Sequence, residues 1–351
     1  MNSRCASSDR PGSQAGVALV VALLVFAICA AVLVALQRDF DLSYRRALNS
    51  FVSEQSWAYL RGAEDLASLA LKLDYDADLA SETARDDLNE IWAQQATPYA
   101  LDEGGWMFGS LTDLQGRFNL NSLGDPPATT TVTYSPAQET FIRLLQALDA
   151  VEIDQFTAIA ITEAVADWID ADDEPRLNGA ESAYYVSRQP SYRPANRPMM
   201  SVSELLAVAA VTPDIYQALR PVVTVWPQQP AAINIHTAPR PVLRALNVYG
   251  NLQPLSPGEG DSLVQLRQDG GFASLEEFLQ LPIFSGDSSA GIATLLTESS
   301  SYFLLASRVE IADREQRLYS VLRRQARDID VLQRINASLY DMPSPPAKSS
   351  P

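Results

Sequence analysis

The sequence predicts an α+β fold. In this fold a long N-terminal α-helix packs on an antiparallel β-sheet, and a large inserted α-helical domain is made of two small helical modules. Three observations predict it. An apolar run near the N-terminus continues into an amphipathic helical pattern. Strand-like alternation occurs near residues 106–120 and again near 302–335, on either side of a mostly helical block. Because the entropy of loop closure grows only logarithmically with length, that block is best explained as an insertion into the sheet.

The composition excludes several classes of protein. The chain has 351 residues, with 26 Lys and Arg against 43 Asp and Glu, and its formal charge is −17. A nucleic-acid-binding protein needs a basic surface, and so does a protein that docks on anionic lipid, so both are disfavoured. The single histidine is His236, while Cys5 lies before the apolar run and Cys29 inside it. A His/Cys zinc site and a disulfide framework are therefore excluded, and any bound metal is expected to be a hard cation such as calcium.

The N-terminus predicts a membrane anchor. Residues 1–16 are polar, and residues 17–36 carry no charge. About 20 such residues in a helix cross the roughly 30 Å hydrocarbon core of a bilayer. A plain signal anchor is one interpretation, whereas a cleaved secretory signal fits less well, because the run is long and no Ala-x-Ala site follows it. The positive-inside rule does not fix the orientation, since Arg38, Arg45 and Arg46 follow the run.

A second interpretation of the N-terminus comes from Gly16, which directly precedes the apolar run. Prepilin peptidases cleave after such a glycine, which would make residues 1–16 a leader peptide and Val17 the mature N-terminus. Residues 37–73 contain no proline, and their apolar residues recur three or four positions apart. They are predicted to be a stalk helix that continues the membrane helix, about 85 Å in all. The alternative is a juxtamembrane linker helix.

Two segments are predicted to form the β-sheet body. Residues 74–122 are its first part, in which 106–111 and 117–120 are expected to form a β-hairpin around the turn 112–116. Residues 299–338 are its second part, with a hairpin of strands 302–311 and 316–326 and a further strand at 328–335. Residues 339–351 are rich in proline and serine and are predicted to be a disordered tail.

The inserted domain is expected at residues 123–298, as modules 123–220 and 231–298. A weak internal repeat supports two modules, because Asn119–Ser122 resembles Asn234–Thr237, and in each copy a short helix capped by serine follows. The second module also resembles helix-hairpin-helix domains that bind DNA, but its hairpin carries Glu259 and the surrounding charge is acidic, which argues against DNA binding. The short segments expected here are helices within 135–169 and at 202–210, 213–220, 239–246, 261–267 and 275–281, and a strand at 222–226.

An acidic cluster follows the predicted helix that ends near Ile169. Like charges this close repel one another, so an ordered loop needs a counter-ion or a basic partner. Counted from Asp170, oxygen donors fall at the ligand offsets of an EF-hand calcium loop, but Pro175 occupies the position that requires glycine. The loop is therefore not an EF-hand, although its spacing can still wrap a calcium ion. The cluster comprises Asp167, Asp170, Asp172, Asp173, Glu174 and Glu181, with Asn178 between them.

The same acidic residues could instead form a solvated loop that is paired with Arg176. A membrane-anchored periplasmic hydrolase with a carboxylate site is the alternative from a different functional class, although nothing in the sequence separates the pKa values of two acids. His236 follows Asn234 and Ile235 in a turn and is expected to be structural, because no nucleophile motif such as Gly-x-Ser-x-Gly accompanies it.

Several motifs in order resemble the K-type minor pseudopilins of type II secretion systems, and the resemblance covers nearly the whole chain. The motifs are Gly16–Leu24, Asp113–Asn121, Asp167–Asp172, the Gly179-Ala180-Glu181 and Tyr184-Tyr185 pair, Asn196–Met199 and Ile233–Pro239. The resemblance implies a pilin-like body with an inserted calcium-binding α-domain and no enzymatic activity. It also implies a minor pseudopilin at the tip of the pseudopilus, which nucleates assembly for export of folded proteins across the outer membrane.

The resemblance further implies a single-pass inner-membrane protein with its C-terminal domain in the periplasm. Its implied partners are the I-type and J-type minor pseudopilins, prepilin peptidase and the inner-membrane assembly platform, with N-methylation of Val17. Most pilins carry Glu where this chain has Val21. That Glu pairs with the N-terminal ammonium of a neighbouring subunit, and a tip subunit, having no subunit above it, can dispense with the acid. The implied calcium ligands are Asp170, Asp172 and Glu181, then Asp173, Glu174, Asp167, Asn178 and the carbonyl of Leu177.

Overall fold

The computed structural model describes residues 15–81, 84–94, 96–102, 104–124, 133–284, 292–311 and 314–336. The predicted disordered tail and all but the last two residues of the predicted leader lie outside these ranges. The chain divides into two compact units, residues 1–58 and 59–351. Helix α1 (Ala15–Ser81) contributes to both.

In the first unit, α1 exposes apolar side chains on all sides from Val17 to Leu36. A helix that is apolar all round requires an apolar surrounding such as lipid or other helices.

Helix α1 was predicted to end near residue 73 but continues to Ser81. The reason is that Asp74, Asp76 and Asp78 are compatible with helix and each faces an arginine or another polar group of the second unit, so the polar sequence after Leu73 does not break it.

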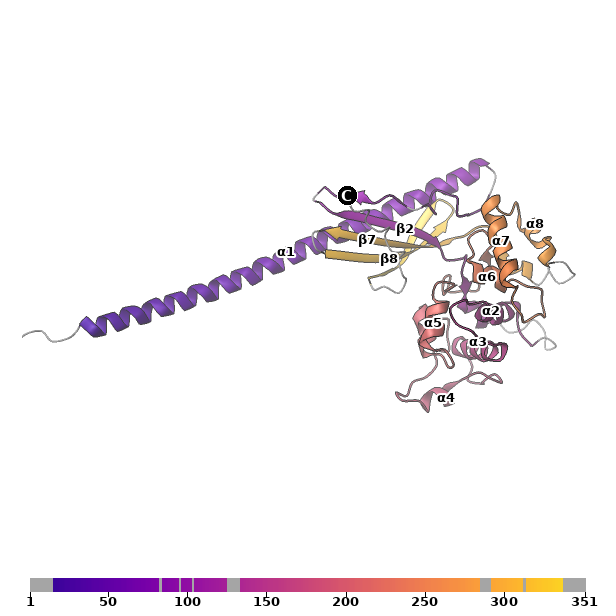
Figure 1. Ribbon diagram of the computed structural model, residues 1–351, viewed down its shortest axis with the longest axis horizontal. Helices are drawn as coiled ribbons and strands as arrows, with labels where there is room; N and C mark the ends of the chain where they lie inside the picture. The colour runs from indigo at the N-terminus through magenta and orange to yellow at the C-terminus, as the bar shows by residue number, and fades with distance from the viewer. Residues whose placement is uncertain are drawn as a thin grey trace, which may run out of the picture. The chain divides into compact units, whose positions relative to one another are not determined.

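The second unit contains a five-stranded antiparallel sheet of order β1-β2-β7-β8-β9 (Figure 1). Its strands are β1 (Tyr99–Ala100), β2 (Trp106–Asp113), β7 (Tyr302–Ile311), β8 (Arg314–Gln325) and β9 (Asp328–Ile335). The predicted C-terminal hairpin and the strand after it are thus confirmed. One face of the sheet packs on α1 through Ala67 and Leu71, which meet Phe303, Leu305 and Leu322.

The hairpin predicted at residues 106–120 is wrong. Strand β2 pairs with β1 and β7, while β3 (Phe118–Asn119) pairs in parallel with β4 (Val223–Thr224). The turn leads away from the sheet because the Asn234 N–H donates to the Gln115 carbonyl. A side chain at Gly116 would collide with Thr237, so the backbones approach closely here. Residues 118–123 consequently belong to the core of the inserted domain, which begins about five residues earlier than predicted.

The inserted domain consists of two helical modules, each closed by a two-stranded parallel sheet formed from its first and last residues. In the first module β3 pairs with β4, and in the second β5 (Ile233–Asn234) pairs with β6 (Leu296–Thr297). The asparagine that begins each predicted repeat is therefore the second residue of an opening strand. The helical segments are η1 (Leu120–Gly124), α2 (Pro136–Gln146), α3 (Gln155–Ile169), α4 (Ser182–Val186), η2 (Val202–Ala207) and α5 (Pro213–Leu219), then α6 (Arg240–Ala245), α7 (Pro257–Asp269), α8 (Leu275–Leu279) and η3 (Pro282–Phe284).

A buried polar junction joins the inserted domain to the sheet body. The Asn234 amide donates to the Asp86 carbonyl at 3.0 Å, to Asp113 Oδ2 at 3.2 Å and to Ser300 Oγ at 2.9 Å. Ser300 Oγ itself donates to Asp113 Oδ2. Unpaired buried polar groups are costly, so these mutual bonds fix the position where the chain leaves the sheet and returns to it.

Candidate metal centre

The predicted acidic loop begins at the C-terminal end of α3. The last turn of this helix is buried because Trp168 and Ile169 pack in the core of the inserted domain. Asp167, on the same turn, is fully buried, and Asp170 caps the helix in an extended conformation. The chain then returns through residues 171–180, so that Glu181, which is 3% exposed, comes back against the helix end.

The structure brings Asp167, Asp170 and Glu181 together, with one oxygen of each within 4.8 Å of the others. The guanidinium of Arg176 lies between the two aspartates, with Nη1 at 2.5 Å from Asp167 Oδ1 and 2.5 Å from Asp170 Oδ2. The pairing of the loop with Arg176 is therefore present. The cluster contains one arginine and three carboxylates, so it has an excess of about two negative charges when all three acids are ionised.

Three oxygen atoms of this cluster are buried and have no hydrogen-bond partner within the described ranges. They are Asp170 Oδ1 and both carboxylate oxygens of Glu181. Burial raises the pKa of Glu181 to about 7, with a further contribution from the charges of Asp167 and Asp170. Buried carboxylate oxygens that lack donors are the arrangement a hard divalent cation satisfies.

The other predicted ligands lie outside this group of three. Asp172 and Glu174 are exposed, and Asp172 Oδ1 accepts from the Glu174 N–H. Asp173 is exposed and accepts from the Ser182 N–H at 3.1 Å. The Leu177 side chain is 94% exposed, and its backbone carbonyl stays a predicted ligand. Asn178 turns away, since its N–H and its amide both donate to Glu163. The structure thus groups Asp167 with Asp170 and Glu181, because the end of α3 provides buried oxygens, while Asp172 stays a predicted ligand.

Glu163 was not singled out from the sequence. It is buried, and it accepts from the Asn178 N–H at 2.6 Å and from the Tyr134 hydroxyl at 3.1 Å. It therefore anchors the returning half of the acidic loop to α3. A signal was available, because Glu163 precedes Asp167 by four residues and shares its helix face, and an acid on a helix face that is otherwise apolar requires a partner.

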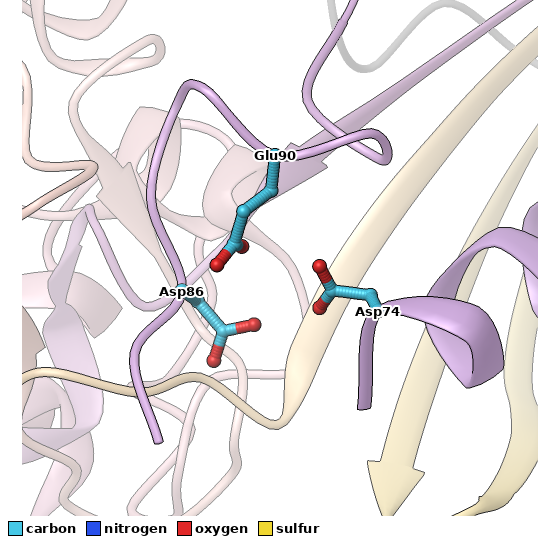
Figure 2. Close-up of side chains that lie close together, drawn as sticks. All are labelled: Asp74, Asp86 and Glu90. Carbon is cyan, nitrogen blue, oxygen red and sulfur yellow. The ribbon is translucent and has the colours of Figure 1, made fainter. Parts of the chain in front are cut away.

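A second acidic cluster, not predicted from the sequence, lies beneath the sheet. Figure 2 shows Asp74 of α1 facing Asp86 and Glu90 from the segment that follows the helix. Here the carboxylates have partners. Arg324 donates to Asp74 Oδ2 at 2.8 Å and to Asp86 Oδ2 at 2.6 Å, and Glu90 Oε2 accepts from the Trp92 indole at 2.6 Å. This cluster is therefore an ion-pair network centred on Arg324.

The second cluster makes stability depend on pH. Burial raises the pKa of Glu90 to about 8, whereas its unfolded value is 4.5. The folded protein therefore holds this proton more tightly, and the resulting stability is fully present below pH 4.5 and is lost as pH rises towards 8. We expect Glu90→Gln, which mimics the protonated acid, to raise the melting temperature by a few degrees at pH 8 and to leave it unchanged at pH 4.5. Melting curves of both proteins across this range test it, and parallel pH profiles would contradict it.

His236 has a structural environment. Its side chain is 1% exposed and lies 6.0 Å, centroid to centroid, from Phe272. Burial lowers its pKa to about 4, so the ring is neutral at ordinary pH. Its backbone N–H donates to Asn234 Oδ1, which places it in the buried polar junction between the inserted domain and the sheet body.

The fold combines a long helix, apolar over residues 17–36, with an antiparallel sheet on which the C-terminal part of that helix packs. This arrangement defines the class of the pilin-like α+β proteins. Two sequence profiles described as type II secretion system (T2SS), protein K match residues 116–228 and 233–299. The chain is 35% identical over 319 residues to the type II secretion system protein K of Pseudomonas aeruginosa, covering 89% of each chain. It is 31% identical to that of Klebsiella pneumoniae, covering 92% of this chain and 96% of the relative.

A solved structure has the same fold. The GspK-GspI-GspJ complex from the type 2 secretion system of enterotoxigenic Escherichia coli contains a chain that matches with a TM-score of 0.71 and 26% identity, over 83% of this chain and 99% of that one. The chain belongs to the type II secretion system protein K family, whose members are structural components of a secretion system. Its role is accordingly that of a minor pseudopilin, and α1 carries one stretch long and apolar enough to cross a membrane.

Proposed function

We propose that this protein lies at the tip of the type II secretion pseudopilus and nucleates its assembly with the I-type and J-type minor pseudopilins, for export of folded proteins across the outer membrane. The observation that carries the proposal is the insertion of a helical domain between β2 and β7, at one end of the sheet (Figure 1). A subunit inside a filament must leave both ends of its body free for neighbours. A bulky domain at one end of the body blocks further addition there, which suits the first subunit and no later one.

The N-terminal sequence supports the same placement. Residues 17–36 are apolar and all exposed along α1, apart from the partly covered Ala30. They anchor the chain in the inner membrane, with the C-terminal domain in the periplasm, and provide the helix that packs with other pseudopilins and with the assembly platform. At the position where most pilins have a buried Glu, this chain has Val21. A tip subunit tolerates the loss of this acid, because no subunit above it supplies an N-terminal ammonium to pair with.

Processing by prepilin peptidase provides the test. We expect the chain extracted from membranes that contain the peptidase to lose residues 1–16 and to gain one methyl group on Val17, and to keep its full mass without the peptidase. Intact-mass spectrometry measures both. As a control, Gly16→Leu should keep the full mass in both membranes. An unprocessed wild-type chain in the presence of active peptidase would contradict the pseudopilin assembly pathway.

The proposal includes calcium at the acidic loop. Asp167, Asp170 and Glu181 would hold the ion, because their oxygens lie close together and those of Glu181 and one of Asp170 are buried without a partner in the described ranges, as calcium ligands require. The bound ion would fix the return of the loop against α3 and so make the inserted domain rigid. This role is structural, and it needs no catalytic group.

A further inference from the structure

His236 is the single histidine of the chain, and neither the acidic loop nor the proposed tip role uses it. It comes soon after β5, and Glu298 directly follows β6, the strand that pairs with β5. Its side chain is 1% exposed, and its Nε2 atom has no hydrogen-bond partner in the part of the chain that the structure describes. Glu298 Oε1 also lacks a partner among these residues, and it lies 3.9 Å from Nε2, beyond hydrogen-bond distance. The fold therefore controls the protonation state of this imidazole.

The segment after α1 is bound to the second module next to this histidine. Arg85 Nη1 donates to the Phe272 carbonyl at 3.3 Å, and the Phe272 ring lies against the imidazole. The Asp86 N–H donates to the Glu298 carbonyl at 3.0 Å. Both acceptors belong to residues whose side chains lie beside His236. These two hydrogen bonds form a latch between the second module and the sheet body.

Charged groups from three segments face the imidazole. Arg85 and Asp87 come from the segment after α1, Arg267 comes from α7, and Glu298 comes from the end of β6. Burial, followed by the charge of Arg85, lowers the pKa of His236 from 6.5 to about 4, against the opposing charge of Asp87. A proton added to the ring would meet two guanidinium charges in a site that excludes water. The closed latch therefore resists protonation of the ring.

We propose that His236 is an acid-sensitive switch, whose protonation releases the latch between the second module and the sheet body. This inference goes beyond the proposed tip role, and it does not depend on the calcium site. Opening of the latch exposes the imidazole to water, where it takes up a proton readily, so acid favours the open form. In the periplasmic location proposed above, the switch makes the rigidity of the inserted domain depend on the acidity of the surroundings.

The closed latch binds fewer protons than the open one, because the pKa of His236 in the fold, about 4, lies below its ordinary value of 6.5. The contribution of His236 to stability is thus fully present above pH 6.5 and is lost as the pH falls towards 4. Between pH 7 and pH 5 the equilibrium constant for opening should rise about 20-fold. Glu90, whose pKa is raised, responds in the opposite direction, so the melting temperature of the whole chain combines both effects. A local measurement on His236 is therefore needed.

Nuclear magnetic resonance provides this measurement, because one histidine gives one set of imidazole signals. In the full-length chain, labelled only at histidine and held in detergent, we expect these signals to titrate near pH 4. Arg85→Gln should raise the midpoint, because it removes a positive charge that faces the ring. Arg188→Gln is the matched control and should leave the midpoint unchanged, since the Arg188 guanidinium is exposed and lies 4.8 Å from the Tyr184 ring in the first module. A wild-type midpoint at or above 6.5 would overturn the switch.

Hydrogen exchange followed by mass spectrometry locates the opening. The comparison is between the wild type and His236→Phe at the same pH, because Phe keeps a buried ring beside Phe272 and cannot titrate. Between pH 7 and pH 5 the ratio of wild-type to variant exchange should rise about 20-fold in residues 84–90 and 268–275 and stay constant in α2. His236→Gln, a second variant that cannot titrate, should give the same ratios. A constant ratio in all segments would refute the switch, and an equal rise in α2 would mean that acid unfolds the whole domain and that no latch opens.

Discussion

Replacing Arg324 by alanine is expected to destabilise the folded protein by about 3–5 kcal/mol, because it leaves buried carboxylates without their cation. Arg324 is 7% exposed and donates to Asp74, to Asp86 and to the Ser300 carbonyl. Asp86 is fully buried, and Asp74 is 4% exposed. Removing the guanidinium therefore leaves two negative charges unpaired in a region that excludes water.

The network also connects separate parts of the chain. Asp74 lies on α1, two turns before its end, Asp86 lies in the segment after the helix, and Ser300 marks the return of the chain from the inserted domain. Loss of Arg324 should therefore lower the midpoint of chemical unfolding of the whole second unit and not only loosen one strand. Unfolding of the detergent-solubilised full-length chain in urea, followed by tryptophan fluorescence, gives the free energy.

The neighbouring arginine is the matched control. Arg323 bonds to Asp330 at 2.6 Å across the β8–β9 pair, but both side chains are substantially exposed. An exposed ion pair contributes about 0–1 kcal/mol, so Arg323→Ala should unfold almost like the wild type. Equal losses in the two variants would mean that the effect comes from the strand and not from the buried charges.

Much of this architecture could be predicted from local patterns. The C-terminal strands were predictable because their apolar and polar residues alternate, and β9 begins and ends at the expected residues. The helical modules were visible in serine-capped short helices. The predicted hairpin at 106–120 failed because its second half pairs with β4, more than 100 residues later, through contacts around Gln115 and Gly116 that no local pattern encodes.

The acidic loop of the candidate site could be predicted from the sequence, but the place of Asp167 beside Asp170 and Glu181 could not. The spacing of Asp170 and Glu181 was visible in the sequence, and the structure brings both together. Asp167 was predicted only as a secondary calcium ligand, because burial at a helix end depends on tertiary packing. Arg324 lies 250 residues from Asp74, so the second cluster could not be seen from spacing at all.

The second large effect is expected at Glu181. In wild-type protein with calcium at about 100 times the dissociation constant, binding should add about 2.7 kcal/mol to stability. Glu181→Gln keeps the shape of the side chain and removes a ligand charge, so it should forfeit most of this gain and lower the melting temperature in calcium by about 5 °C. In chelator the variant should melt at the same temperature as the wild type or above it, since it also removes repulsion from Asp167 and Asp170.

Glu174→Gln separates ligation from net charge. Glu174 belongs to the same loop and carries the same charge, but it is exposed and lies outside the group of three carboxylates. It should therefore keep nearly the full calcium-dependent rise in melting temperature, which calorimetry of the full-length chain with calcium or with chelator measures. If both variants lost this rise equally, the loop would attract calcium only by its charge, and if the wild type showed no rise, Arg176 alone would balance the cluster. A rise lost only with Glu181 means that the ion is bound at the end of α3, where it ties the returning loop to the inserted domain.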